Sequence, residues 1–269
     1  MLPFLFDDIS FRGEHPTVLA FGAHSDDIEI GCGGTLLQLA ERYPGLEVVW
    51  VVLSATDERE DEARASAAAF AGSAASLRVI VEDFRDMYFV HDGEPMRRLF
   101  EDLKSELDPD LILTHRRADT HQDHRFVCEL TWNTFRNNLI LEYEVPKYDG
   151  DLSSPNLFIP ITRDAAQRKI DTILRCFATQ RGRHWFTEDM FMAMLRLRGM
   201  EANSPTDLAE AFTCRKVVLE MSRAAAHVNG DRPHLRRSLR PIPGERIGGS
   251  VVRLPGAQPG EATGEGFAG

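Results

Sequence analysis

Residues 17–35 read TVLAFGAHSDDIEIGCGGT, and this segment gives the clearest indication of the fold class. Its first six residues are apolar and rich in strand formers, and a polar cluster beginning at His24 follows them. Residues 33–43 (GGTLLQLAERY) have the spacing of an amphipathic helix that stops at Pro44 and Gly45. A strand, a polar turn and a helix in this order predict the start of a β-α-β unit.

The same alternation continues downstream. Residues 46–53 (LEVVWVVL), 77–81 and 110–114 (DLILT) are predicted strands, and residues 58–70 and 95–107 are predicted helices. LEVVWVVL is apolar almost throughout, as expected of a strand that is covered on both faces. These segments predict an α/β, Rossmann-like fold with a mostly parallel sheet and helices on both faces.

The second half of the chain predicts a mixed C-terminal portion. We expect strands at residues 139–145 and 215–221 and helices at residues 165–180 and 187–198. From about residue 241 the chain is rich in glycine and proline, which predicts an extended or poorly ordered tail. The expected organisation is a single domain over residues 1–240 and a tail over residues 241–269.

Composition excludes several classes of protein. The net charge of −11 argues against a nucleic-acid partner, because phosphate backbones would repel it. The four cysteines are scattered, so neither a thiolate zinc site nor a disulfide framework is expected. No apolar run approaches the roughly 20 residues that span a bilayer, and the N-terminus does not resemble a signal peptide. A cytoplasmic protein is the default expectation, and a homo-oligomer stays open.

Two clusters of histidines and carboxylates follow predicted strands. The first contains His24, Asp26 and Asp27, and the second extends from His115 to His124. Ligands of parallel sheets bind beyond the carboxyl ends of the strands, so we expect the two clusters to meet there. Histidine and carboxylate without cysteine are typical of a catalytic zinc that keeps an open position for water.

Both clusters also have less specific interpretations. The G-x-G-G after the first strand could cradle a phosphate, but Leu36 occupies the last glycine position of the dinucleotide-binding motif, and the carboxylates would repel phosphate. The second cluster could be a polar surface turn, with Asp123 near a helix start where its charge is favourable. The agreement between the two clusters favours a metal site.

The motifs resemble those of the PIG-L/LmbE-like deacetylases. The family's A-H-P-D-D motif appears here as AHSDD at residues 23–27 and continues as IEIGCGGT. Its second motif, a histidine and an aspartate followed by H-x-D-H, matches His115, Asp119 and residues 121–124 (HQDH). Weaker likenesses are REDEA at residues 59–63, ATQ at 178–180 and AEAF at 209–212, so the resemblance spans roughly residues 17–221. Ser25 replaces the family's proline, which should loosen the turn.

The resemblance implies a zinc-dependent enzyme with a defined set of site residues. His24, Asp27 and His124 would be the metal ligands, holding Zn²⁺, with Fe²⁺ or another divalent metal left open because this ligand set suits several ions. Asp26 would be the general base. His121 would stabilise the oxyanion or protonate the leaving amine, and Asp123 would orient His121.

Three further residues have supporting roles under the same resemblance. His115 and Asp119 would hold the metal ligands from behind. Arg59 would bind substrate hydroxyls or a phosphate, since its guanidinium offers several fixed donors. The alternative for Arg59 is an ion pair with Glu58 or Glu62 on an exposed helix face.

The resemblance therefore implies a hydrolase that removes an acetyl group from an N-acetylated amino sugar, an N-acetylglucosamine-like conjugate, and releases acetate and a free amine. The expected partner is this small molecule. Two alternatives stay open: an amidase acting on a thiol conjugate or another acylamide, and a non-catalytic sugar or nucleotide binder.

Overall fold

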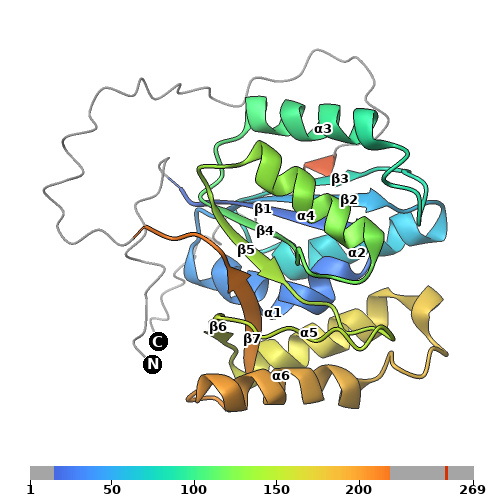
Figure 1. Ribbon diagram of the computed structural model, residues 1–269. Helices are drawn as coiled ribbons and strands as arrows, with labels where there is room; N and C mark the ends of the chain where they lie inside the picture. Colours follow the sequence, from blue (N-terminus) through green and yellow to red (C-terminus); the bar gives the residue numbers. More distant parts are fainter. Residues whose placement is uncertain (1–14, 219–251, 254–269) are drawn as a thin grey trace, which may run out of the picture.

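A parallel sheet forms the centre of the computed structural model, which describes residues 15–218 and the pair Val252–Arg253. Its core strands are β1 (Thr17–His24), β2 (Glu47–Ser54), β3 (Ser76–Val81), β4 (Leu111–His115) and β5 (Leu139–Tyr143). They lie side by side in the order β3-β2-β1-β4-β5, and every neighbouring pair is parallel (Figure 1). The predicted α/β class with a mostly parallel sheet is confirmed.

Helices cover both faces of this sheet (Figure 1). One face packs against α1 (Asp27–Arg42), α2 (Glu58–Ala71), α5 (Arg163–Cys176) and α6 (Glu188–Ala202), and the other against α3 (Gly93–Glu106) and α4 (Gln122–Thr134). Strand side chains alternate between the two cores: Trp50 and Val52 join the first, and Val49 and Val51 join the second. Burial on both faces explains why β2 is apolar almost throughout.

The strand order changes direction between β1 and β4. The chain runs outward from β1 through β2 to β3, then returns to place β4 on the other side of β1. Connections therefore leave the carboxyl ends of β1 and β4 toward opposite sides of the sheet. Open α/β sheets bind their ligands at such a switch point.

The C-terminal portion adds antiparallel strands. Strand β7 (Ala209–Cys214) pairs antiparallel with both β5 and β6 (Leu157–Pro160). The predicted strand at 215–221 is wrong, because the ladder ends at Cys214, residues 215–218 form no strand, and residues 219–221 lie outside the described residues. Residues 215–221 are richer in strand-forming residues, but residues 209–214 (AEAFTC) are the ones that pair with the neighbouring strands β5 and β6. The helix predicted at 165–180 ends at Cys176, and a 3-10 turn, η2 (Ala178–Gln180), follows.

Helix α1 begins at Asp27, earlier than the predicted start at residue 33, and it breaks at Cys32 (φ −146°, ψ 17°). The glycines on either side of the break allow close packing. A Cβ on Gly31 would lie 2.1 Å from the ring of Tyr143, and one on Gly33 would lie 2.5 Å from the ring of Phe70. The glycines therefore let the first turn of α1 press against β5 and α2.

A buried ion pair satisfies the backbone at this break. Glu210 accepts the N–H groups of Gly34 (2.8 Å) and Thr35 (2.7 Å), which the break frees from the helix. The Lys169 amine donates to Glu210 (2.6 Å) and to the carbonyl of Ile30 (2.7 Å). We call Thr35, Lys169 and Glu210 the helix-break cluster; its three side chains are buried.

Only part of the predicted tail is described. Val252–Arg253 (β8) pair antiparallel with β3, and the rest of residues 241–269 lies outside the described residues. The division into a domain over residues 1–240 and a tail stays a prediction. Among the described helices, none combines the length and the apolar character needed to cross a membrane.

Candidate metal centre

The first two residues of the candidate metal centre are held together by the turn that joins β1 to α1. His24 is the last residue of β1, and Asp27 is the first residue of α1. The Asp27 carboxylate accepts the backbone N–H of His24 at 2.7 Å, and its Oδ2 lies 3.4 Å from His24 Nδ1. The turn therefore directs an imidazole nitrogen and a carboxylate oxygen to one point.

The third residue comes from the neighbouring strand. His124 lies in the first turn of α4, after the loop that leaves β4. Its Nε2 is 3.4 Å from His24 Nδ1 and 3.5 Å from Asp27 Oδ1. Residues 100 positions apart in the chain thus converge where β1 and β4 end side by side.

These separations suit a bound cation. A tetrahedral zinc ion bound at about 2.0–2.1 Å needs ligand atoms about 3.3 Å apart. His24 Nδ1 lies 3.4 Å from Asp27 Oδ2 and 3.4 Å from His124 Nε2, and His124 Nε2 lies 3.5 Å from the second Asp27 oxygen, Oδ1; two of the three residues are buried. The donor set and its spacing fit a divalent metal ion.

Two buried residues brace this group from behind, where the sequence placed its supporting residues. The Asp119 carboxylate lies 3.1 Å from His124 Nδ1, and the other ring nitrogen of His124, Nε2, faces Asp27. The Nε2 atom of His115 lies 3.2 Å from Asp27 Oδ2, and the His115 ring stacks on His124 with centroids 3.9 Å apart. Such contacts fix the orientation of metal ligands.

The electrostatics of the centre favour ionised carboxylates. Burial opposes ionisation of Asp27, but the nearby His124 and His115 outweigh it and hold the pKa of Asp27 well below its usual value. Burial likewise opposes ionisation of Asp119. The contacts of Asp119 with His124 and Lys147 outweigh this effect and lower the pKa of Asp119. Two anionic carboxylates close to imidazoles form a site that attracts a cation.

Asp26, the predicted base, lies between the metal centre and an arginine. Burial and the charge of Asp27 raise the pKa of Asp26, while Arg59 opposes the shift. Arg59 donates to the Asp26 carboxylate (3.3 Å) and, through Nε, to the hydroxyl of Ser25 (2.8 Å). The serine that replaces the family's proline thus adds a contact: it helps to hold Arg59 beside Asp26.

Arg59 therefore contacts Asp26 beside the metal centre rather than Glu62 on an exposed helix face, and its binding of substrate stays a prediction. Glu62, offered above as its surface partner, instead accepts the backbone N–H and the hydroxyl of Thr179. The Arg59 side chain is 33% exposed, so part of its guanidinium still faces solvent at the rim of the site. It can hold Asp26 and remain open to a substrate.

His121 and Asp123 both lie at the centre, in an arrangement that differs from the expected one. His121 caps the N-terminus of α4, and its ring is 5.1 Å from His24 and 4.5 Å from His124 by centroid. The Asp123 carboxylate, however, lies beside His24 Nε2 (3.6 Å) and accepts the backbone N–H of Met87 (2.6 Å). Asp123 meets His121 only through its own backbone N–H, at 3.3 Å. Its carboxylate is thus placed to orient His24 rather than His121.

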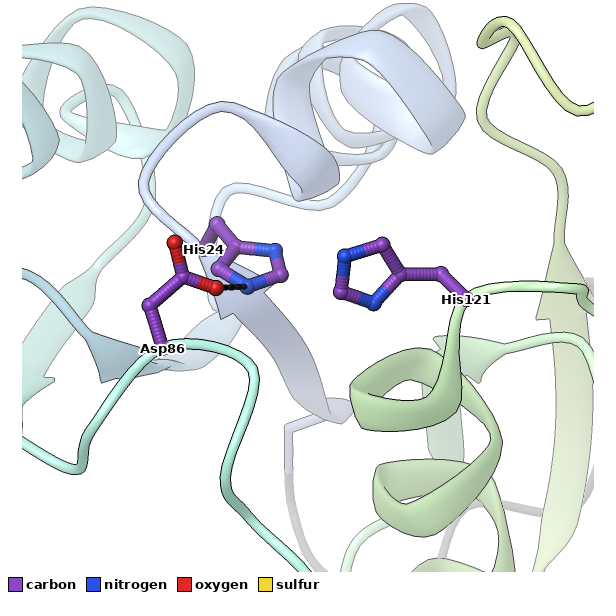
Figure 2. Close-up of side chains that lie close together, drawn as sticks. All are labelled: His24, Asp86 and His121. Carbon is purple, nitrogen blue, oxygen red and sulfur yellow. Dashed lines mark hydrogen bonds and ion pairs between the residues drawn. The ribbon is translucent and has the colours of Figure 1, made fainter.

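Sequence reasoning missed Asp86. Its carboxylate lies 3.0 Å from His24 Nε2, on the side of the ring opposite Asp27, and His121 faces the same ring (Figure 2). Asp86 belongs to the loop that follows β3, so the rule that placed the other two clusters at the carboxyl ends of strands would also have found it. No flanking motif distinguished it.

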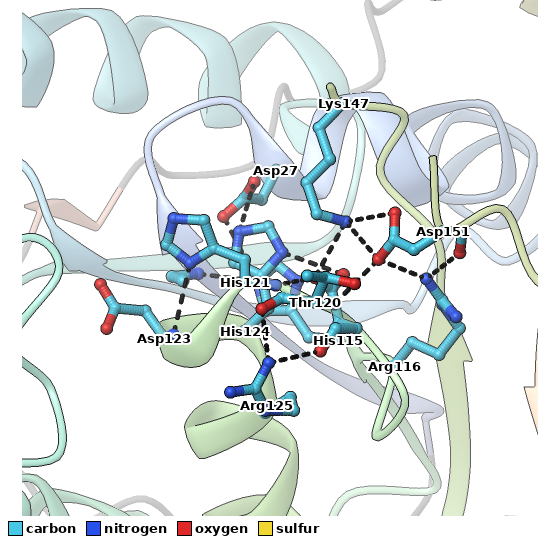
Figure 3. A network of polar contacts seen from close by, with 12 residues as sticks. Asp27, His115, Arg116, Thr120, His121, Asp123, His124, Arg125, Lys147 and Asp151 are labelled. Carbon is cyan, nitrogen blue, oxygen red and sulfur yellow. Dashed lines mark hydrogen bonds and ion pairs between the residues drawn. The ribbon is translucent and has the colours of Figure 1, made fainter. Parts of the chain in front are cut away.

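Lys147 and Asp151 were also missed. They lie in the segment after β5 and join the polar network behind His124 (Figure 3). The Lys147 amine lies 2.9 Å from the Asp119 carboxylate and 2.9 Å from that of Asp151. A lone lysine in a loop gives no sequence signal, because its partners become neighbours only in the folded sheet.

Comparison with known sequences identifies the family. Residues 19–135, which contain both clusters, match the model of the PIG-L family, described as GlcNAc-PI de-N-acetylase. A relative in Escherichia coli (strain K12), the uncharacterized deacetylase YaiS, is 32% identical over 151 residues, which cover 51% of this chain and 78% of the relative.

Solved structures share the fold at lower identity. GalB, the 4-carboxy-2-hydroxymuconate hydratase from Pseudomonas putida KT2440, is 18% identical with a TM-score of 0.64, over 77% of this chain and 99% of that one. The N,N'-diacetylchitobiose deacetylase from Pyrococcus horikoshii is 19% identical with a TM-score of 0.56, over 74% and 83%. The fold thus serves more than one reaction, and the family is identified by the sequence matches. On those matches, the chain belongs to the PIG-L family of deacetylases.

Proposed function

We propose that this protein is a metal-dependent N-deacetylase that removes the acetyl group from an N-acetylated amino sugar conjugate. The observation that carries the proposal is the convergence of His24 Nδ1, the Asp27 carboxylate and His124 Nε2 within 3.4–3.5 Å of one another. Membership of a deacetylase family supports the reaction class. Because a hydratase shares the fold, the proposal rests on these residues rather than on the architecture.

His24, Asp27 and His124 would hold the ion. A divalent cation at this position would polarise the amide carbonyl and make a nearby water more acidic. We propose Zn²⁺ as the ion, with Fe²⁺ as the alternative, since imidazole and carboxylate suit both. Reconstitution of chelated protein with each ion separately would rank them by rate.

Asp26 would act as the general base. It directly precedes the ligand Asp27, is buried, and has one oxygen held by Arg59, so the other oxygen can take the proton of an attacking water. His121 lies across the ring of His24 and would donate a proton to the leaving amine or a hydrogen bond to the oxygen of the tetrahedral intermediate. Asp123 would fix the orientation of His24.

Arg59 and Asp86 flank the centre and would recognise the substrate. Arg59 offers guanidinium donors, and Asp86, whose side chain is 63% exposed, offers carboxylate acceptors. A sugar presents hydroxyl groups that both donate and accept, so a donor and an acceptor on two sides of the metal centre suit it.

The test is release of acetate from a panel of N-acetyl sugars, with amides of thiol conjugates and simple acylamides beside them. Zinc-loaded protein should release acetate and a free amine from at least one N-acetylated sugar, and chelated protein should not. Preference for a thiol conjugate or a simple acylamide would establish the amidase alternative. Binding of a sugar or nucleotide without turnover, and without any need for Asp26, would establish the binder.

A further inference from the structure

We propose that Lys147 is a positioning residue for the metal ligand His124, acting through the carboxylate of Asp119; this inference rests on the proposed metal centre. Lys147 lies between β5 and β6, outside both motifs. Its side chain is largely buried, and its Nζ lies 2.9 Å from Asp119 Oδ1.

The two oxygens of Asp119 have different partners. Oδ2 lies 3.1 Å from His124 Nδ1, whereas Oδ1 accepts the backbone N–H of His121 at 2.8 Å and meets Lys147. The Asp119 carboxylate is thus held in place through Oδ1, the oxygen that does not contact His124. Rotation of Asp119 away from His124 would break both contacts of Oδ1.

The charge of Lys147 determines what Asp119 can do. An ammonium group in contact with a buried carboxylate stabilises the anion, and a carboxylate anion can only accept hydrogen bonds. His124 Nδ1 must then donate, which leaves the lone pair of Nε2 free for a cation. Lys147 would therefore favour the form of His124 that can bind a metal ion, through two successive contacts, Lys147 with Asp119 and Asp119 with His124.

A purely structural role would involve Asp151 instead. Lys147 also pairs with Asp151 (2.9 Å), which accepts the backbone N–H of Thr120 (2.8 Å) and pairs with Arg116 (3.0 Å). These contacts join the loop after β4 to the loop after β5. The side chain of Arg116 shares this loop-joining contact, but among the described residues it bonds to Ala118 and Asp151 and not to the Asp119 carboxylate, so Arg116 provides the matched control.

The experiment measures the Zn²⁺ dissociation constant by competition with a chelator in Lys147→Met, Lys147→Arg and Arg116→Met. Lys147→Met should weaken zinc binding about 10- to 100-fold, the range observed when outer partners of metal ligands are removed. Lys147→Arg, which keeps the charge, should recover most of the affinity, and Arg116→Met should stay within about threefold of wild type. Thermal unfolding of each metal-free variant checks that it is folded.

A double-mutant cycle tests the route through Asp119. In an Asp119→Asn background, Lys147→Met should change zinc affinity by less than about threefold, because the carboxylate it acts on is gone. An unchanged affinity in Lys147→Met, an equal loss in Arg116→Met, or full additivity with Asp119→Asn would each overturn the inference. Failure of wild-type protein to bind zinc would instead overturn the metal centre itself.

Discussion

The metal centre and the helix-break cluster are both buried groups of charged side chains, but they balance their charge differently. In the helix-break cluster, Lys169 neutralises Glu210, and backbone groups of α1 use the remaining hydrogen-bonding capacity. In the metal centre, the described side chains in contact with the Asp27 carboxylate are imidazoles, and the lysine of the surrounding network pairs with Asp119 and Asp151 instead. The first cluster is complete within the chain.

The difference separates a structural cluster from a functional one. A buried charge must be paired, and the cost of leaving it alone is several kcal/mol. Where the chain supplies the opposite charge, as at Glu210, the cluster contributes to folding. Where nitrogen and carboxylate lone pairs point at a common position, as at Asp27 and His124, we propose that an external cation completes the group. Four predictions test this distinction, in order of decreasing effect.

The largest effect is expected from Asp27→Asn. The amide loses the charge that balances a cation, so zinc affinity should fall by more than the 10- to 100-fold typical of outer partners, and deacetylation should fall with it. Zinc titration and acetate release measure the two losses. A variant that kept both would place the ion elsewhere and end the comparison. His124→Ala should behave in the same way.

Asp26→Asn should separate catalysis from metal binding. Loss of the general base should lower kcat by about 10²- to 10⁴-fold, while zinc affinity stays close to that of the wild type because Asp26 is not a ligand. The two measurements are kcat with a saturating sugar substrate and zinc content after dialysis. Full activity in a pure, zinc-loaded sample would show that another group takes the proton.

Glu210→Gln probes the complete cluster. The amide leaves Lys169 buried without a counter-charge, which should lower the free energy of unfolding by about 3–5 kcal/mol. Zinc affinity should be unaltered in the folded fraction. Adding Lys169→Met should recover part of the stability, because the unpaired charge is removed. Denaturant unfolding measures each step, and a loss of zinc binding at constant stability would mean that the two clusters are not independent.

The smallest effect is expected from Ser25→Ala. The substitution removes the acceptor for Arg59 Nε, so the grip of Arg59 on Asp26 should loosen. Loss of one hydrogen bond to a charged group is worth about 1.5–3 kcal/mol, part of which the remaining contact with Asp26 offsets, so we expect kcat/KM to fall about tenfold. Zinc affinity should not change. An unaltered kcat/KM would show that Arg59 needs no second anchor.

The sequence predicts those parts of the molecule whose structure follows from a local pattern of residues. The strands and helices from residue 17 to residue 114 follow from apolar periodicity, and the two polar clusters follow from their place after strands. Their meeting at β1 and β4 follows from the rule for parallel sheets. Spacing alone could not choose between His121 and His124; the resemblance made that choice.

The parts that were missed depend on contacts between distant segments. Strand β7 forms where β5 and β6 supply partners, and not where strand-forming residues are densest. Glu210 in β7 and Lys169 in α5 are 41 residues apart, and they meet at the break in α1, where both contact its backbone. The Asp123 carboxylate lies beside His24 and accepts the backbone N–H of Met87, which belongs to a segment 36 residues away in the chain. Such pairings are properties of the folded chain.

The central claim is that one cation completes the cluster of His24, Asp27 and His124. Its most direct test is the metal content of wild-type protein that has been stripped with a chelator, reloaded with Zn²⁺ and dialysed against metal-free buffer. Our account predicts one zinc ion bound per chain, and none in Asp27→Asn treated in the same way. Wild-type protein that retains no more zinc than Asp27→Asn would contradict it.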